Sequence, residues 1–260
     1  MGIEKTNTWL KDSFNDPIAI CKKISPSSSK KELNKLYQYL CQFGMYRPTK
    51  DCQTTYEELI KNKTWEKVQS YFQKYKKEWN GPDIPIYIFP IGNRNGLFFK
   101  SNNSKSGVSF QDKLFLFLSN VKDDKEIEAL FVHEYHHVCR MNGLKKSISE
   151  YTLLDSLIME GLAEDAVHEH LGKQYTASWS KELSDEHFQQ YWKKYLKEHL
   201  AVKKSDSLHD HLLFGKGLVP NMLGYTCGYH LVRTYKKKKH FSTISSFLLS
   251  PEIFFKNASK

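Results

Sequence analysis

The sequence lacks long apolar runs and paired cysteines, and both absences narrow the classes of protein to which it can belong. None of its 260 residues fall in a run of about 18 apolar residues, so we expect no membrane-spanning helix. The polar N-terminus has no apolar core behind it, so we expect no secretory signal peptide. The five cysteines are scattered and form no Cys-x-x-Cys pair. This pattern argues against a disulfide framework and a cysteine zinc site, and it predicts a reducing, cytoplasmic location.

Acidic charge is also scarce, since the formal net charge is +10. The lysines are spread through helical stretches such as 74–77, 193–197 and 236–239. This spread is typical of solvated helix faces. A recognised nucleic-acid-binding module is missing, so we do not expect a nucleic acid as a partner. The oligomeric state is left open.

The hydrophobic pattern predicts an α+β protein that is mainly helical and has a small sheet. Short β-branched and aromatic runs lie between two groups of helical segments and favour a sheet of three or four strands. Asn80-Gly81-Pro82 is a breaker that divides a helical N-terminal region, 1–80, from a catalytic domain, 81–260. The expected helices are 30–44, 55–79, 124–142, 148–171, 185–200, 220–238 and 251–257, and the expected strands are 84–89, 96–99 and 113–118.

The chemistry is carried by a His-Glu-x-x-His motif. His133 and His137 are four residues apart, so on a helix they project from one face, one turn from each other. Two imidazoles at that spacing can bind one metal ion. Glu134 lies beside the metal rather than pointing at it, where it can accept a proton from a water molecule.

The residues around this motif are apolar, including Leu130, Phe131, Val132 and Val138. A helix with such flanks is expected to be buried on most sides. Polar side chains inside it need strong partners, because unsatisfied burial costs several kcal/mol. A metal ion is such a partner.

A second apolar-striped helix offers the third ligand, Glu160. This residue lies where the stripe faces inward, and Gly161 and Ala163 permit a close approach of the helix backbone. Gly143 and the loop after it are expected to provide the turn between the two helices. Two histidines and one glutamate form a known catalytic zinc set that leaves a position open for water.

His133-Glu134-x-x-His137 followed by Glu160-Gly161-Leu162-Ala163 resembles the gluzincin metallopeptidases. The fuller motifs, which extend to Glu164 and to a later Gly-Tyr-x-x-Gly-Tyr at 224–229, look like the YjaZ-like bacterial predicted Zn-dependent proteases. The resemblance covers roughly residues 85–240. It implies a zincin-like domain, one catalytic zinc ion, a water nucleophile and a peptide or protein substrate.

Carried over by position, the resemblance makes His133, His137 and Glu160 the ligands and Glu134 the general base. Glu164 matches the carboxylate that orients a ligand histidine through its other ring nitrogen. Gluzincins also use a tyrosine or histidine of a later helix to stabilise the oxyanion. Tyr229 is the first candidate for that role and Tyr225 the second.

Four points stay open in the sequence. His136 is a hydrogen-bonded neighbour or a substrate-side group rather than a ligand, and His209 and His211, in an expected loop, are weaker oxyanion candidates. The sheet edge near 107–110 could hold an extended peptide, by analogy of fold. A zinc-binding regulatory protein without proteolytic activity is the main alternative function, and an intact Glu134 speaks against it. A basic partner-binding protein in which hydrolysis is incidental is a further alternative.

Overall fold

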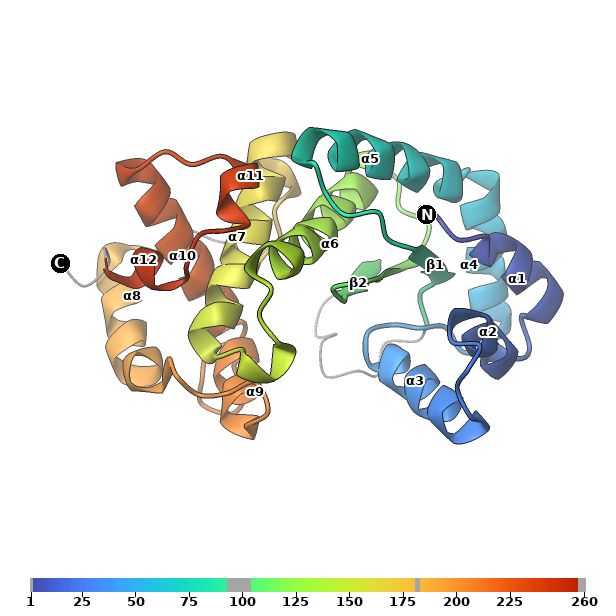
Figure 1. Ribbon diagram of the computed structural model, residues 1–260, viewed down its shortest axis with the longest axis horizontal. Helices are drawn as coiled ribbons and strands as arrows, with labels where there is room; N and C mark the ends of the chain where they lie inside the picture. The colour runs from blue at the N-terminus through green and yellow to red at the C-terminus, as the bar shows by residue number, and fades with distance from the viewer. Residues whose placement is uncertain (1, 93–103, 181–182, 257–260) are drawn as a thin grey trace. The chain divides into compact units, whose positions relative to one another are not determined.

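The computed structural model describes residues 2–92, 104–180 and 183–256. It is mainly helical with one three-stranded sheet, which confirms the predicted α+β class (Figure 1). The chain forms two compact units, Met1–Tyr135 and His136–Lys260. The division falls inside helix α6, Asp124–Leu144, which continues without a break from one unit into the next. The predicted domain boundary near residue 80 stays a prediction.

The first unit contains five helices before the sheet. Three of them start with a side-chain N-cap: Asp16 accepts from the Ala19 N–H, Ser29 forms a capping box with Glu32, and Thr49 accepts from the Cys52 N–H. One predicted helix, 55–79, is wrong as a single element. Lys63 adopts a left-handed conformation with φ of 52° and separates two helices there. The five are α1 Thr6–Ser13, α2 Pro17–Ile24, α3 Lys30–Gln42, α4 Lys50–Lys61 and α5 Thr64–Trp79.

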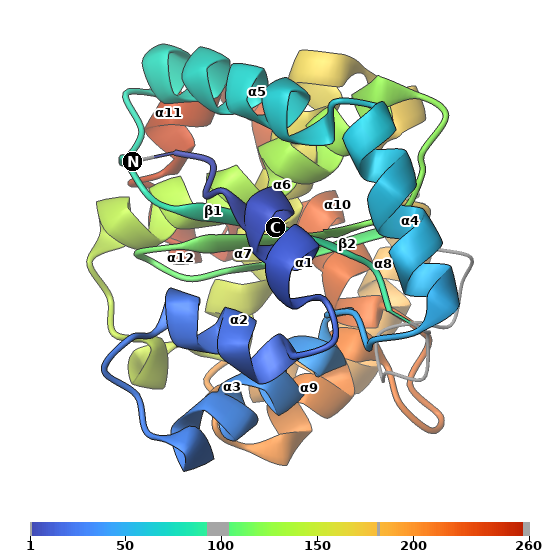
Figure 2. The ribbon, with the colours of Figure 1, turned by 90° about the vertical axis from the view of Figure 1, so that its right-hand side faces the viewer.

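The sheet has the strand order β1-β3-β2, with β1 Ile86–Pro90, β2 Lys105–Ser109 and β3 Leu114–Leu118. β3 lies in the middle and pairs parallel with β1 and antiparallel with β2. Figure 2 labels the two outer strands, β1 and β2. Every residue of β1 and β3 is buried, whereas β2 is an edge strand that is mostly half-buried. The predicted strand 96–99 lies outside the described residues.

Aromatic packing fixes the first half of α6 in the first unit. The Trp79 and Tyr135 rings stack with centroids 5.8 Å apart, and Phe131 stacks on Tyr135 at 5.4 Å. The Tyr75 hydroxyl donates to the carboxylate of Glu128. This aromatic packing holds α6 against α5. His133 and His137 therefore lie on another face of α6.

The second unit is helical and is built around α7, Leu153–Leu171, which is buried along most of its length. Thr152 and Asp155 form a capping box at its start, and Gly172, with φ of 97°, ends it. The other helices are α8 Asp185–Tyr191, α9 Ser207–Phe214, α10 Leu223–Lys238, α11 Thr243–Ser246 and α12 Glu252–Lys256. Short 3₁₀ turns lie at Ile148–Glu150, Lys173–Tyr175 and Lys197–His199, and a π-helical turn lies at Trp192–Leu196.

Helices α7 and α10 touch through glycines. A Cβ atom on Gly161 would lie 2.5 Å from the carbonyl carbon of Gly228, and one on Gly228 would collide with the Leu157 carbonyl oxygen. The two backbones therefore approach more closely than any side chain would permit. This confirms the close approach predicted at Gly161, and its partner is α10.

Several predicted elements of the second unit are corrected. The helix expected at 148–171 is a short 3₁₀ turn followed by α7, and the one expected at 185–200 divides into α8, a π-helical turn and a 3₁₀ turn. His209 and His211 lie in α9 rather than in a loop. Gly143 lies inside α6, where a Cβ atom would lie 2.8 Å from the Phe247 carbonyl oxygen, so it serves packing and not a turn.

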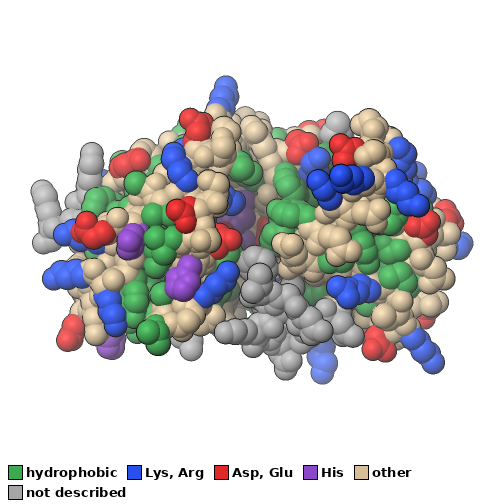
Figure 3. Space-filling model, turned by 90° about the horizontal axis from the view of Figure 1, so that it is seen from below, with side chains coloured by type: hydrophobic (Ala, Val, Ile, Leu, Met, Phe, Trp, Pro, Cys, Tyr) green, Lys and Arg blue, Asp and Glu red, His purple; other side chains and the backbone are tan. Residues whose placement is uncertain are grey.

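On the face drawn in Figure 3, lysine and arginine side chains are interspersed with acidic ones on each unit. This distribution agrees with the predicted solvated faces. None of the helices in the described ranges combines the length and apolar character that crossing a lipid bilayer requires.

Candidate metal centre

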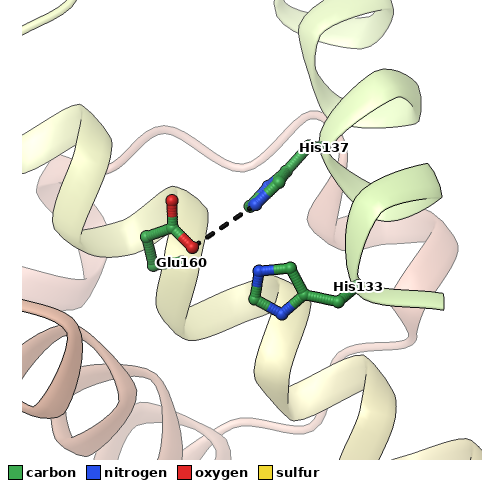
Figure 4. A group of neighbouring side chains, drawn as sticks. All are labelled: His133, His137 and Glu160. Carbon is green, nitrogen blue, oxygen red and sulfur yellow. Dashed lines mark ion pairs between the residues drawn. The ribbon is translucent and has the colours of Figure 1, made fainter. Parts of the chain in front are cut away.

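Helix α6 presents His133 and His137 one turn apart, and α7 presents Glu160 towards them (Figure 4). One potential ligand atom of each side chain lies within 4.8 Å of the corresponding atoms of the other two. Because α6 is one continuous helix, its own geometry fixes His133 beside His137. The structure thus brings together the three residues that the sequence predicted as ligands.

The pair His137 and Glu160 allows a test of whether a zinc ion fits. His137 Nε2 and Glu160 Oε2 are 3.4 Å apart, and their side chains are 11% and 16% exposed. Two ligand atoms about 2.1 Å from one tetrahedral zinc ion lie about 3.4 Å from each other. Two imidazoles and one carboxylate are also a donor set that zinc accepts. The residues therefore fit a zinc ion.

The carboxylate of Glu134, the residue that follows His133, lies against strand β2. The Ser109 hydroxyl is 2.5 Å from Glu134 Oε2 and 2.9 Å from the Glu134 carbonyl oxygen. A Cβ atom on Gly107 would lie 2.6 Å from Glu134 Cδ. Glu134 is only 8% exposed. It is thus held beside the ligands without belonging to the set of three.

Glu164, one turn after Glu160, is buried and accepts a hydrogen bond from the Ala177 N–H. That contact fastens the segment after α7 to the helix. The predicted role of Glu164 in orienting a ligand histidine stays a prediction. His136 is fully buried, and its Nε2 lies 3.0 Å from the Ser246 hydroxyl, which agrees with the interpretation as a hydrogen-bonded neighbour.

The two candidate tyrosines of α10, Tyr225 and Tyr229, lie in different surroundings. The buried Tyr229 hydroxyl is 3.0 Å from His168 Nδ1, two turns beyond Glu160 on α7. Burial, together with the charge of Arg233, lowers the pKa of His168 and favours a neutral ring that accepts from the tyrosine. Tyr225 is half-buried between the rings of Trp179 and Phe214. The oxyanion role of either tyrosine stays a prediction.

A buried guanidinium supports α6 just after the histidines. Arg140 is 1% exposed and donates to the carbonyl oxygens of Ser246 and Leu249. Burial lowers its pKa to about 10. Arg140 thus ties the second half of α6 to the end of α11 and to the segment that follows it.

Sequence reasoning missed two polar contacts near the ligands. The first is the bond from Ser109 to Glu134, although 107–110 was singled out as a sheet edge. The second joins Ser156, one turn before Glu160, to His209 Nε2 at 2.8 Å, while His209 Nδ1 lies 2.8 Å from Asp210. His209 is fully buried in this chain of contacts, so it connects α9 to α7. The only sequence signal was the helical spacing of Ser156 and Glu160.

Comparisons with known proteins agree with this centre. Residues 64–256 match the family described as "Predicted Zn-dependent protease (DUF2268)". The chain is 37% identical over 256 residues to "Uncharacterized protein YjaZ" of Bacillus subtilis (strain 168), with 98% of each chain covered. It is 28% identical over 126 residues to "Uncharacterized protein YjfC" of the same organism, over 45% of this chain and 42% of the relative. No solved structure matches the chain.

The matched range of the family includes all three clustered side chains, His133, His137 and Glu160, and both helices that carry them. The resemblance to the YjaZ-like proteins that the motifs indicated is therefore confirmed. The chain belongs to the YjaZ-like family of predicted Zn-dependent proteases.

Proposed function

We propose that the protein is a zinc-dependent peptidase with a zincin-like catalytic domain, in which α6 is the active-site helix. One observation carries the proposal: His133, His137 and Glu160 converge within 4.8 Å, and Glu134 follows directly on the first of them. A zinc site that serves structure alone has no need of such a glutamate. The set of three also leaves one tetrahedral position open, which is the mark of a catalytic rather than a structural site.

In this proposal, three residues bind the metal ion and Glu134 transfers the proton. His133, His137 and Glu160 would hold one zinc ion. Zinc, when bound, supplies a Lewis acid that polarises a carbonyl group and acidifies water. Glu134 accepts the proton of the attacking water at its carboxylate and delivers it to the leaving amine. Glu164 is proposed to orient a ligand histidine through its carboxylate.

A peptide is the proposed substrate, and strand β2 supports it. β2 is the edge of the described sheet, next to the Glu134 carboxylate. The Phe110 N–H donates to the Lys113 carbonyl and the Ser119 N–H to the Ser104 carbonyl, so the even-numbered residues of this strand pair with β3. The backbone groups of Lys105, Gly107 and Ser109 then point outward. An extended peptide could add to them as a further strand.

The oxyanion donor is proposed to come from α10. Tyr229 is the first candidate and Tyr225 the second. If Tyr229 serves, Tyr229→Phe lowers kcat and leaves the KM and zinc content near the wild-type values. A loss in Tyr225→Phe alone would assign the role to Tyr225.

The proposed compartment is the cytoplasm. The five cysteines, which all lie in the described ranges, form no disulfide bond, and burial raises the pKa of Cys227 to about 12. A thiol that stays protonated is slow to oxidise.

Zinc analysis paired with a peptide-library digest tests the proposal. We expect about one zinc ion per chain and cleavage that disappears when a chelator removes the metal. Zinc without any cleavage of peptides or proteins would favour the regulatory alternative instead.

A further inference from the structure

The Glu134 carboxylate has one described partner outside its own helix, and that partner is Ser109. The hydroxyl Oγ lies 2.5 Å from Glu134 Oε2. A hydroxyl at this distance is within hydrogen-bonding reach of the carboxylate oxygen. The backbone carbonyl of Glu134, at 2.9 Å, is the second acceptor within reach. Since the hydroxyl has one proton, the closer acceptor, the carboxylate, receives it.

Gly107 forms the other half of this contact. A Cβ atom there would lie 2.6 Å from Glu134 Cδ and 2.7 Å from Oε1. The carboxylate therefore occupies the space that a side chain at residue 107 would fill. Any larger residue would push the flexible end of Glu134 aside, because the backbone of α6 is fixed by its aromatic contacts.

Ser109 and Gly107 act together because side chains alternate along a strand. Residues 105, 107 and 109 share the face of β2 that packs on α6. Lys105 Nζ confirms this register, since it lies 2.6 Å from Glu126 Oε2, near the start of α6. The strand thus lies along the helix, and its last residue reaches the catalytic glutamate.

We propose that Ser109 is a positioning residue for Glu134: its hydroxyl holds Oε2, Gly107 provides the space, and Oε1 is left to accept the proton. The inference rests on the proposed function, since it assigns a purpose to the orientation of the general base. It also links that base to the strand that the peptide is proposed to join. A bound substrate and the base are then aligned by the same five residues of β2.

The test compares Ser109→Ala, Ser109→Thr and Gly107→Ala with the wild type. Ser109→Ala is expected to lower kcat by about 10- to 100-fold, the usual range for a residue that orients another. The KM and the zinc content are expected to stay within about twofold, because neither ligand nor substrate contacts are removed. Ser109→Thr keeps the hydroxyl and is expected to restore most of the activity. Gly107→Ala is expected to lower kcat because it displaces the carboxylate.

Ser106→Ala is the matched control. It removes the same hydroxyl from the same strand, but on the opposite face, three residues away from Ser109. Thermal unfolding of all variants separates a loss of positioning from a loss of folding. If Ser109→Ala lost stability while kcat stayed unchanged, the hydroxyl would only fasten β2 to α6 and the inference would be overturned.

A second readout does not depend on activity. In a crystal structure of the metal-free wild type, Glu134 Oε2 is expected to accept a hydrogen bond from the Ser109 hydroxyl. In a crystal structure of Ser109→Ala, the Glu134 carboxylate is expected to be displaced. An unmoved carboxylate, or a wild type without the hydrogen bond, contradicts the inference. The crystal structures could show the hydrogen bond in the wild type and its loss in Ser109→Ala while neither protein cleaves peptides. In that case the proposed function fails, but the placement of Glu134 by Ser109 stands.

Discussion

Helices α6 and α7 each bring one carboxylate to the centre, and the two are held in different ways. Glu134 of α6 is fixed by a side-chain hydroxyl from β2, 25 residues earlier in the chain. Glu160 of α7 is followed by Gly161, whose backbone touches that of Gly228 in α10. The Ser109 hydroxyl is the described contact that holds the first carboxylate, whereas the second lies beside a close contact between two helices. Activity and metal affinity should therefore be separable by mutation.

The largest separation of activity from metal binding is expected from Glu134→Gln. The amide is nearly the same size but cannot accept the proton, so kcat should fall by about 10²- to 10⁴-fold while zinc is retained. Peptide hydrolysis and metal content of the purified variant measure both effects. Glu128→Gln, on the same helix but in contact with Lys74 and Tyr75, is the control. Cleavage that survives in Glu134→Gln would refute the assignment of the base.

Glu160→Gln is expected to act first on metal binding. A neutral amide is a poor zinc ligand, so the zinc Kd should rise by more than about 100-fold, above the range for residues that only orient a ligand. Competition with a chelator measures the Kd. Glu169→Gln is the control on α7, because Glu169 pairs with Lys236. Equal zinc affinity in the two variants would exclude Glu160 as a ligand.

Packing behind Glu160 is tested by Gly228→Ala. The new methyl group would meet the Leu157 carbonyl oxygen and force α7 and α10 apart. We expect a loss of about 1–3 kcal/mol in the free energy of unfolding, typical of overpacking, together with weaker zinc binding. Urea unfolding of the metal-free protein gives the first quantity. Thr234→Ala on the same helix is the control, and an unchanged stability would argue against the tight contact.

The smallest effect is expected from His168. Its pKa is lowered from 6.5 in the folded protein, so the unfolded chain binds the proton more readily. The stability that a neutral His168 contributes is therefore present above pH 6.5 and lost as the pH falls below that value. His168→Gln should flatten the decrease in the free energy of unfolding between about pH 7.5 and 5.5. The same slope in both proteins would mean that His168 is not perturbed by folding.

The ligand set could be predicted from the sequence because its signals are local. His133 and His137 lie at helical spacing, and Glu160 lies on an apolar stripe that continues for the length of α7. Gly161 also indicated a close helix contact, although its partner α10 is more than 60 residues away and had no local signal. The α+β class followed from the change of hydrophobic period between residues 80 and 124.

The remaining features depend on contacts between distant segments. The helix break at Lys63 depends on a left-handed backbone conformation, and the sequence has no glycine there to indicate it. The contact between Ser109 and Glu134 requires the register of β2 on α6, and periodicity alone does not determine that register. The sequence predicts a loop at His209, because α9, Ser207–Phe214, is short and is stabilised by a buried bond to the distant Ser156. Tertiary contacts of this kind override local propensity.

The central claim is that one zinc ion is held by His133, His137 and Glu160. A crystal structure of the purified protein with anomalous data collected at the zinc edge tests it most directly. We predict one strong peak with two imidazole nitrogens and one carboxylate oxygen at about 2.0–2.2 Å. A peak at other residues, or zinc-soaked crystals with these three side chains in place and no peak between them, would contradict the account.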